Sequence, residues 1–148
     1  MELEDLKSKN YIPTVQCTTI EGQKITFGAA ANKPALLVFF TTWCSSCIEA
    51  APAISRQFEH LKDQINLIGI GREHNAAELM TFKEEEKLAY HLVEDPERAL
   101  FNEFAKMHVP RIYLVDTKGN VRYQDVNWHP FMLEDIQEAV DCLLQKPS

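Results

Sequence analysis

Two cysteines separated by two residues are the side chains of this sequence best suited to chemistry. They are Cys44 and Cys47 in the segment "FFTTWCSSC", and Trp43 directly precedes them. Thiols at this spacing form a redox-active dithiol, half of a metal site, or a pair of unreactive buried side chains. A closed zinc site needs four ligands, and the sequence holds no second Cys-x-x-Cys pair. The spacing therefore favours redox chemistry, and we expect no metal.

An apolar strand and an amphipathic helix must position the two thiols. The continuous apolar run at 34–41 is typical of a strand that is covered on both faces. Beyond it, apolar side chains recur at helical spacing at Cys47, Ala51, Ile54, Phe58 and Leu61. Cys44 is therefore expected at the tip where the helix begins. Cys47 is expected one turn later on the buried face, within disulfide reach.

These two positions make the thiols unequal. Cys44 lies over free backbone N–H groups and the positive end of the helix dipole, which favour a thiolate. Cys47 is shielded beneath it. Thiol–disulfide exchange requires an exposed thiol that attacks and a buried thiol that resolves the mixed disulfide.

The composition is that of an ordinary globular domain. The 148 residues are 45% hydrophobic and 25% charged, which is enough for one domain with a sizeable core. The net charge of −7 argues against a nucleic acid or an anionic membrane as a partner. No apolar run approaches the roughly 20 residues that span a bilayer, and the first ten residues lack the pattern of a signal peptide. We expect a loose arm at 1–10 and one domain at 11–148.

Changes in hydrophobic period along the chain predict the other elements. Strands are expected at 14–19, 24–27, 34–41, 65–71, 111–116 and 121–126, and helices from the cysteines to 61 and at 75–90, 95–107 and 130–145. Asp95 is expected to cap the third helix, with Pro96 in its first turn. Strands separated by helices are parallel neighbours, whereas the late hairpin is antiparallel. The predicted fold class is α/β, with a central mixed sheet flanked by helices.

The cysteine segment and a later proline resemble the thioredoxin superfamily over roughly residues 12–145. The resemblance is carried by "FFTTWCSSC", by Pro52 within the following helix, and by "HVPRIYLVDTKGNV" at 108–121. The N-terminal β-hairpin and one inserted helix are similar to the TlpA/ResA-like branch of thiol–disulfide oxidoreductases. The resemblance implies a thioredoxin-like fold in which Cys44 is the nucleophile and Cys47 is the resolving thiol.

The same resemblance implies a substrate site beside the cysteines. Pro110 matches the family proline that follows a cis peptide bond and faces the thiols. The backbone of Val109 would then pair with an extended substrate chain. Trp43 precedes an exposed cysteine and is expected at the surface of this site.

Two departures from the family pattern leave the proton acceptor for the buried thiol open. Val38 stands where many members have an acid or amide, and Ala50 stands where the TlpA/ResA-like group often has glutamate. The candidate acceptors are His129, His108 and Glu49. His129 comes first, because its loop is expected to end beside the cysteines and an imidazole titrates near neutrality. His74, which follows the second buried strand, is expected at the surface and is held in reserve.

The leading function is disulfide exchange with protein substrates and a redox partner protein. Ser45 and Ser46 lack the histidine found between the cysteines of strongly oxidising members, which favours a reductant. We expect no cofactor, no nucleic-acid partner and a monomer. The resemblance suggests the bacterial cell envelope or periplasm, with the cytoplasm as the alternative.

Two other function classes remain open. A peroxiredoxin-like peroxidase is suggested by Thr41, three residues before Cys44, although Leu37 replaces that family's proline. A Sco-like metal carrier would use the two cysteines and His108. The copper-chaperone group that it resembles spaces its cysteines by three residues rather than two.

Overall fold

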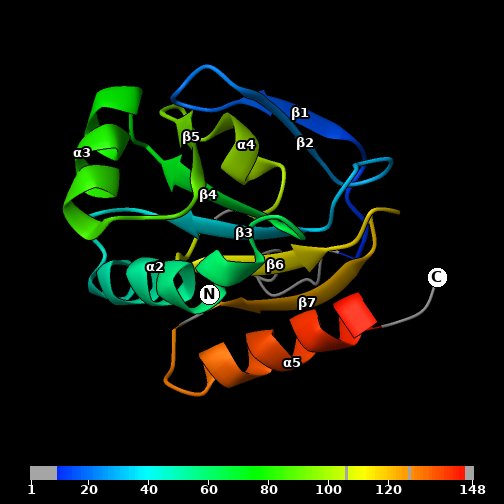
Figure 1. The fold of residues 1–148 in the computed structure, drawn as a ribbon. Coiled ribbons are helices and arrows are strands. Elements are labelled where there is room, and N and C mark those ends of the chain that lie inside the picture. The colour runs from blue at the N-terminus through cyan, green and yellow to red at the C-terminus, as the bar shows by residue number, and fades with distance from the viewer. Residues whose placement is uncertain (1–9, 106, 127, 146–148) are drawn as a thin grey trace.

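A computed structural model describes residues 10–105, 107–126 and 128–145 of the chain (Figure 1). In chain order the elements are β1 (Val15–Thr18), β2 (Lys24–Phe27), β3 (Ala35–Phe40), α2 (Ser45–Phe58), the 3-10 helix η1 (Glu59–Leu61), β4 (Asn66–Arg72), α3 (Ala76–Glu86), β5 (His91–Asp95), α4 (Ala99–Asn102), β6 (Arg111–Val115), β7 (Val121–Val126) and α5 (Met132–Gln145). Strands β1 and β2 form a two-stranded hairpin. The other five strands form one sheet in the order β5-β4-β3-β6-β7.

Strand β3 occupies the centre of the sheet and leads directly to the cysteines. It pairs parallel with β4 and antiparallel with β6, so both of its edges are hydrogen-bonded. All six of its residues are buried. A strand covered on both faces needs apolar side chains throughout, which explains the uninterrupted run "ALLVFF".

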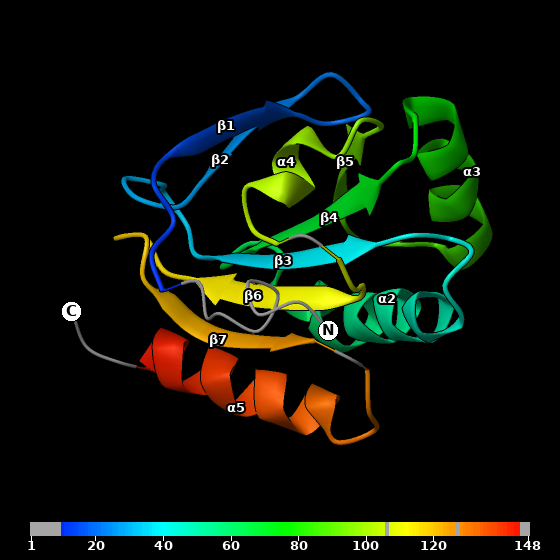
Figure 2. The same ribbon diagram turned by 180° about the vertical axis from the view of Figure 1, so that it is seen from behind.

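The sheet separates two apolar layers (Figures 1 and 2). Helices α2, α3 and α5 contribute to one cluster, which includes Phe40, Ile54 and Ile136. The β1–β2 hairpin and α4 cover the opposite face, where Phe27 and Phe101 join Phe39 of β3. The predicted α/β thioredoxin-like fold, with a mixed sheet, flanking helices and an N-terminal hairpin, is therefore confirmed.

The predicted helix at 75–90 is too long at its C-terminal end. Helix α3 ends at Glu86, and Lys87 adopts the left-handed conformation with φ of 53°. Strand β5 then pairs parallel with β4, and the sequence interpretation missed it. The overlooked signal is the period of two, since Leu88, Tyr90 and Leu92 are buried at alternate positions.

The predicted helix at 95–107 is also corrected. Its structured part is the single turn α4, and Asp95 lies at the end of β5 rather than at the position before a helix. The two carboxylate oxygens of Asp95 still accept the backbone N–H groups of Leu100 at 2.9 Å and Phe101 at 2.8 Å. The prediction of Asp95 as N-cap with Pro96 as the first helical residue was wrong, because α4 begins at Ala99 and Arg98 is its N-cap.

The N-terminal end of the described chain is tied to the β6–β7 turn. Asn10 accepts a hydrogen bond from the Val121 N–H at 3.0 Å, and Tyr11 forms a bridge with Asn120. The predicted loose arm otherwise falls on residues 1–9, which lie outside the described residues. Among the helices of the described ranges, none is long and apolar enough to cross a membrane.

Candidate active site

Cys44 is the N-cap residue of α2. Its backbone is extended, with φ of −96° and ψ of 115°, and its Sγ accepts the Cys47 backbone N–H at 3.3 Å. Serine, threonine or aspartate usually fills this role with an oxygen. The first turn of α2 contains no acidic residue. A thiolate at Cys44 would therefore meet an N–H donor and the positive end of the helix without a competing carboxylate.

Cys47 lies beneath Cys44 on the core-facing side of α2, as the helical spacing predicted. It is 1% exposed, whereas Cys44 is half-buried. Burial raises the pKa of the Cys47 thiol, and its hydrogen bond with Cys44 raises that pKa further. The Thr41 backbone and the positive charge of Arg72 act in the opposite direction. Burial therefore favours the protonated form of the Cys47 thiol.

The segment before β6 faces the cysteines. The Val109–Pro110 peptide bond is cis, as predicted from the resemblance. The Cys44 Sγ donates to the Val109 carbonyl oxygen across 3.6 Å. Arg111 holds the start of the segment, because its Nη2 and Nε donate to the Met107 carbonyl oxygen at 2.8 and 3.1 Å.

His108 has an unusual backbone conformation. Its φ is 72°, in the left-handed region that glycine adopts most easily. The residue is half-buried.

His74 lies under the loop that carries the cysteines, which corrects the surface position that we predicted. It is 1% exposed, and its Nε2 accepts the Thr42 backbone N–H at 2.9 Å. The Trp43 ring lies over it, with ring centroids 4.8 Å apart. Trp43 itself is 60% exposed beside Cys44, so its predicted place at the surface is confirmed.

Arg72 is a site residue that the sequence interpretation missed. The parallel register pairs Phe40 with Gly71, so the last residue of β4 lies beside the loop that follows β3. The Arg72 side chain is largely buried, with its guanidinium 4.9 Å from the centroid of the Phe101 ring and its Nε 3.2 Å from Glu73. The sequence signal that could have identified Arg72 is its position as a basic residue directly after the apolar segment 65–71, at the end of the strand expected beside the cysteines.

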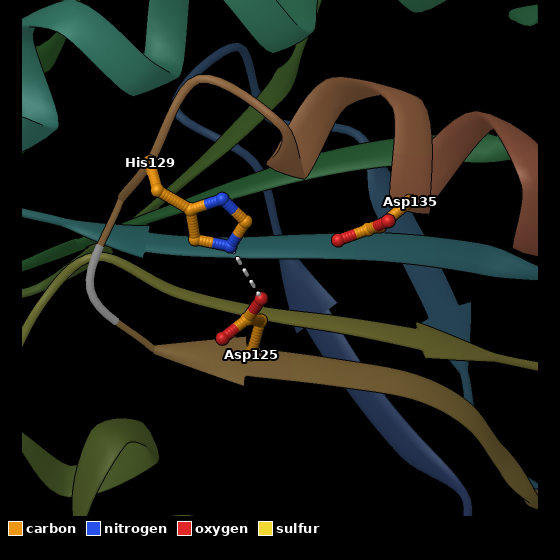
Figure 3. A group of neighbouring side chains, drawn as sticks. All are labelled: Asp125, His129 and Asp135. Carbon is orange, nitrogen blue, oxygen red and sulfur yellow. Dashed lines mark hydrogen bonds and ion pairs between the residues drawn. The ribbon is translucent and has the colours of Figure 1, made fainter.

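Two of the three candidate proton acceptors, Glu49 and His129, lie on α2 and on the connection between β7 and α5. Glu49 lies on the exposed side of α2, opposite the buried Ala50. His129 comes from the β7–α5 connection, and its Nε2 lies 3.2 Å from Asp125 Oδ2 (Figure 3). The structure thus brings Trp43, Val109 and Pro110 to the two cysteines, whereas a relay role for His129, His108 or Glu49 stays a prediction.

Three side chains near the start of α5 have the right chemistry for a divalent cation. Ligand atoms of Asp125, His129 and Asp135 all lie within 4.8 Å of one another (Figure 3). Both Asp125 oxygens are nevertheless engaged within the protein. Oδ2 accepts the Tyr123 hydroxyl at 2.9 Å, and Oδ1 accepts the Val126 N–H at 2.8 Å. These bonds and the pair with His129 account for the arrangement without an ion.

A family model described as AhpC/TSA family matches residues 9–124. The chain belongs to the AhpC/TSA family. Two curated relatives of this family member come from Bacillus subtilis. The thioredoxin-like protein YneN is 22% identical over 87% of this chain and 76% of its own length. The thiol-disulfide oxidoreductase YkuV is 28% identical over 62% of this chain and 66% of its own length.

Solved structures of other proteins share the fold of this chain. StoA from Bacillus subtilis matches with a TM-score of 0.71 and 21% identity, over 86% of this chain and 96% of its own. A secreted disulfide oxidoreductase from Mycobacterium tuberculosis, described as homologous to E. coli DsbE, matches with a TM-score of 0.70 and 20% identity, over 86% and 95%. The thioredoxin domain of a thiol-disulfide oxidoreductase from Bacteroides vulgatus matches with a TM-score of 0.75 and 17% identity, over 95% and 99%. The AhpC/TSA family member described here therefore shares the thioredoxin-like fold.

Proposed function

We propose that this thioredoxin-like protein is a thiol–disulfide oxidoreductase that exchanges disulfides with protein substrates. The observation that carries the proposal is the unequal pair. Cys44 caps α2 and is accessible, and Cys47 lies buried one turn below it with a raised pKa. The names of the relatives YkuV and YneN support the same chemistry.

The reaction proceeds through two sulfur exchanges. The Cys44 thiolate attacks one sulfur of a substrate disulfide, the substrate S–S bond breaks, and the departing sulfur takes up a proton. Cys47 then loses its proton and attacks the Cys44 Sγ. A Cys44–Cys47 disulfide forms, the second substrate thiol leaves, and the two electrons of the dithiol have passed to the substrate.

The substrate chain is proposed to lie along Val109. The Val109 carbonyl oxygen lies beside the Cys44 Sγ, and the adjacent peptide bond is cis. An extended peptide that pairs with this backbone would bring its own sulfur to Cys44. The exposed indole of Trp43 would provide an apolar contact on the other side of the thiol.

The preferred direction is reduction of the substrate by the dithiol, followed by re-reduction by a partner protein. Ser45 and Ser46 place no cation between the cysteines, so they add no charge that would stabilise the reduced form further. We place the protein in a bacterial cell envelope, by analogy with the relative described as secreted. The cytoplasm is the alternative.

Turnover of three probes tests the function. The reduced protein is mixed with insulin as a protein disulfide, with hydrogen peroxide, and with copper or zinc salts followed by metal analysis. We expect turnover of insulin in the presence of a dithiol reductant. Turnover of peroxide alone would favour the peroxidase, and stoichiometric metal without turnover would favour the carrier. Cys142→Ser is the matched control, because that cysteine lies on the exposed side of α5.

The midpoint potential of the Cys44–Cys47 pair tests the direction. A value near roughly −270 mV corresponds to a thioredoxin-like reductant, and a value near roughly −120 mV to a strong oxidant. We expect the lower value. A potential at the oxidising end would overturn the direction and leave the exchange chemistry intact.

A further inference from the structure

The loop between β3 and α2 is held from below by a buried histidine. The loop comprises residues 41–43, and Cys44 follows it directly. The Thr42 N–H donates to His74 Nε2 at 2.9 Å, and the His74 side chain is 2% exposed. A backbone N–H that is bonded to an imidazole nitrogen rather than to a carbonyl depends on the protonation of that ring.

We propose that His74 is a positioning residue that holds the Cys44 loop through its unprotonated Nε2. The assignment rests on the proposed function, because it concerns the same dithiol. An Nε2 that accepts a hydrogen bond requires the neutral tautomer with its proton on Nδ1. Glu78 Oε1 lies 3.6 Å from Nδ1, on the side where that proton must be.

Glu78 is itself fixed in place by the start of α3. Its Oε1 accepts the Asn75 backbone N–H at 2.9 Å, and the Asn75 side chain accepts the Glu78 N–H at 2.9 Å. This capping box holds the carboxylate beside the imidazole independently of the cysteine loop. The Glu78 carboxylate therefore lies beside the His74 ring from the start of α3, whereas Nδ1 has no hydrogen-bond partner among the described residues and Nε2 binds the loop that ends at Cys44.

The surroundings of the ring define what protonation would do. From α3 the charged group is Glu78, and on the turn before His74 the side chains of Arg72 and Glu73 pair with each other at 3.2 Å. The β3–α2 loop contributes the Trp43 ring, and β3 contributes the Phe40 ring, whose centroid lies 6.4 Å away. A second proton on the imidazole would point an N–H at the Thr42 N–H, so this hydrogen bond would be lost and the loop released.

Two amide substitutions distinguish the effect of losing the hydrogen bond to the Thr42 N–H from the effect of losing the imidazole ring. In His74→Gln the side-chain oxygen reaches the place of Nε2, whereas in His74→Asn the shorter side chain reaches only the place of Nδ1. Both variants are polar and uncharged. The measured quantity is the rate at which iodoacetamide alkylates Cys44, resolved by mass spectrometry, in the reduced full chain between about pH 5 and 8.

We expect His74→Gln to keep the wild-type rate near pH 8 within about twofold, and His74→Asn to differ from it by about tenfold. Neither Gln nor Asn takes up a proton, so the comparison of the two variants isolates the hydrogen bond to the Thr42 N–H. Equal rates for the two variants would overturn the assignment.

Nitrogen NMR tests the bond directly. In the ¹⁵N-labelled protein near pH 8, we expect the His74 ring to carry its proton on Nδ1 and to show a coupling between Nε2 and the Thr42 amide nitrogen. A proton on Nε2 would overturn the proposal. Neither measurement needs a disulfide substrate, so failure of insulin turnover would remove the proposed function and leave the positioning role testable.

Discussion

Helices α2 and α5 begin in different ways, although both pack on the same face of the sheet (Figures 1 and 2). The first turn of α5 carries two acids, Glu134 and Asp135, whose charges complement the positive end of the helix. The first turn of α2 carries none, and the sulfur of Cys44 accepts the Cys47 N–H. A negative charge at the start of α2 would therefore meet no competing carboxylate in that turn.

The two histidines near these helix starts show a second contrast. Each lies close to a carboxylate four residues away, His74 to Glu78 at 3.6 Å and His129 to Asp125 at 3.2 Å. The His74 side chain is 2% exposed and also holds a backbone N–H of the cysteine loop, whereas the His129 side chain is 39% exposed. The two histidine–carboxylate pairs therefore differ in their contacts. Only the buried His74 also binds a backbone N–H through its second ring nitrogen.

The largest effect is expected from the cysteines. Cys44→Ser should abolish exchange, because a serine hydroxyl at the same position is not a nucleophile for sulfur. The buried Cys47 should remain unreactive towards alkylation near neutral pH, since its pKa is raised. Cys47→Ser should accumulate a mixed disulfide with insulin, visible on a non-reducing gel. Wild-type turnover by Cys44→Ser would refute the assignment of the nucleophile.

An acid placed in the first turn of α2 would make this turn resemble that of α5, which already carries acids. Ser45 is exposed and follows Cys44 directly. Ser45→Asp should slow the alkylation of Cys44 at neutral pH about threefold to fivefold, because the new carboxylate repels the thiolate and takes up part of the helix dipole. Ser45→Asn is the matched control without charge and should react at the wild-type rate. Identical rates for the two variants would show that the missing acids have no effect on Cys44.

Removal of an acid from α5 should affect stability rather than chemistry. Asp135→Asn is expected to lower the free energy of unfolding by about 0.3–1 kcal/mol in low salt, measured by urea denaturation. Exchange should stay within about twofold of wild type. Asp63→Asn makes the same change at an exposed position outside the helices and should leave stability unchanged. A loss of exchange in Asp135→Asn would connect the start of α5 to the dithiol.

The smallest effect is expected from His129. Because its Nε2 is paired with Asp125, His129→Ala should change the rate of exchange by less than about twofold between about pH 5 and 8. The measurement is the pH profile of insulin turnover beside that of the wild type. A flattened profile would instead restore His129 as the proton relay for Cys47.

The sequence by itself determined the parts of this protein that depend on neighbouring residues. The apolar run before Cys44 predicted a central strand, and the helical spacing beyond it placed Cys47 on the buried face. The resemblance carried by the cysteine segment and the later proline predicted the cis bond at Pro110. These signals are local, because a strand, a helix stripe and a tight turn each depend on residues close together in the chain.

Tertiary structure alone decided the position of β5 and placed His74 and Arg72 near the cysteine loop. Strand β5 was missed because its five residues follow a helical pattern directly, and its pairing with β4 is a contact between distant segments. The parallel register of β3 and β4 brings His74 beneath Thr42, thirty-two residues away, and Arg72 into the electrostatic field of the cysteines. No local sequence pattern specifies the register of β3 and β4, because strand pairing depends on the packing of the whole sheet rather than on the residues beside His74 or Arg72.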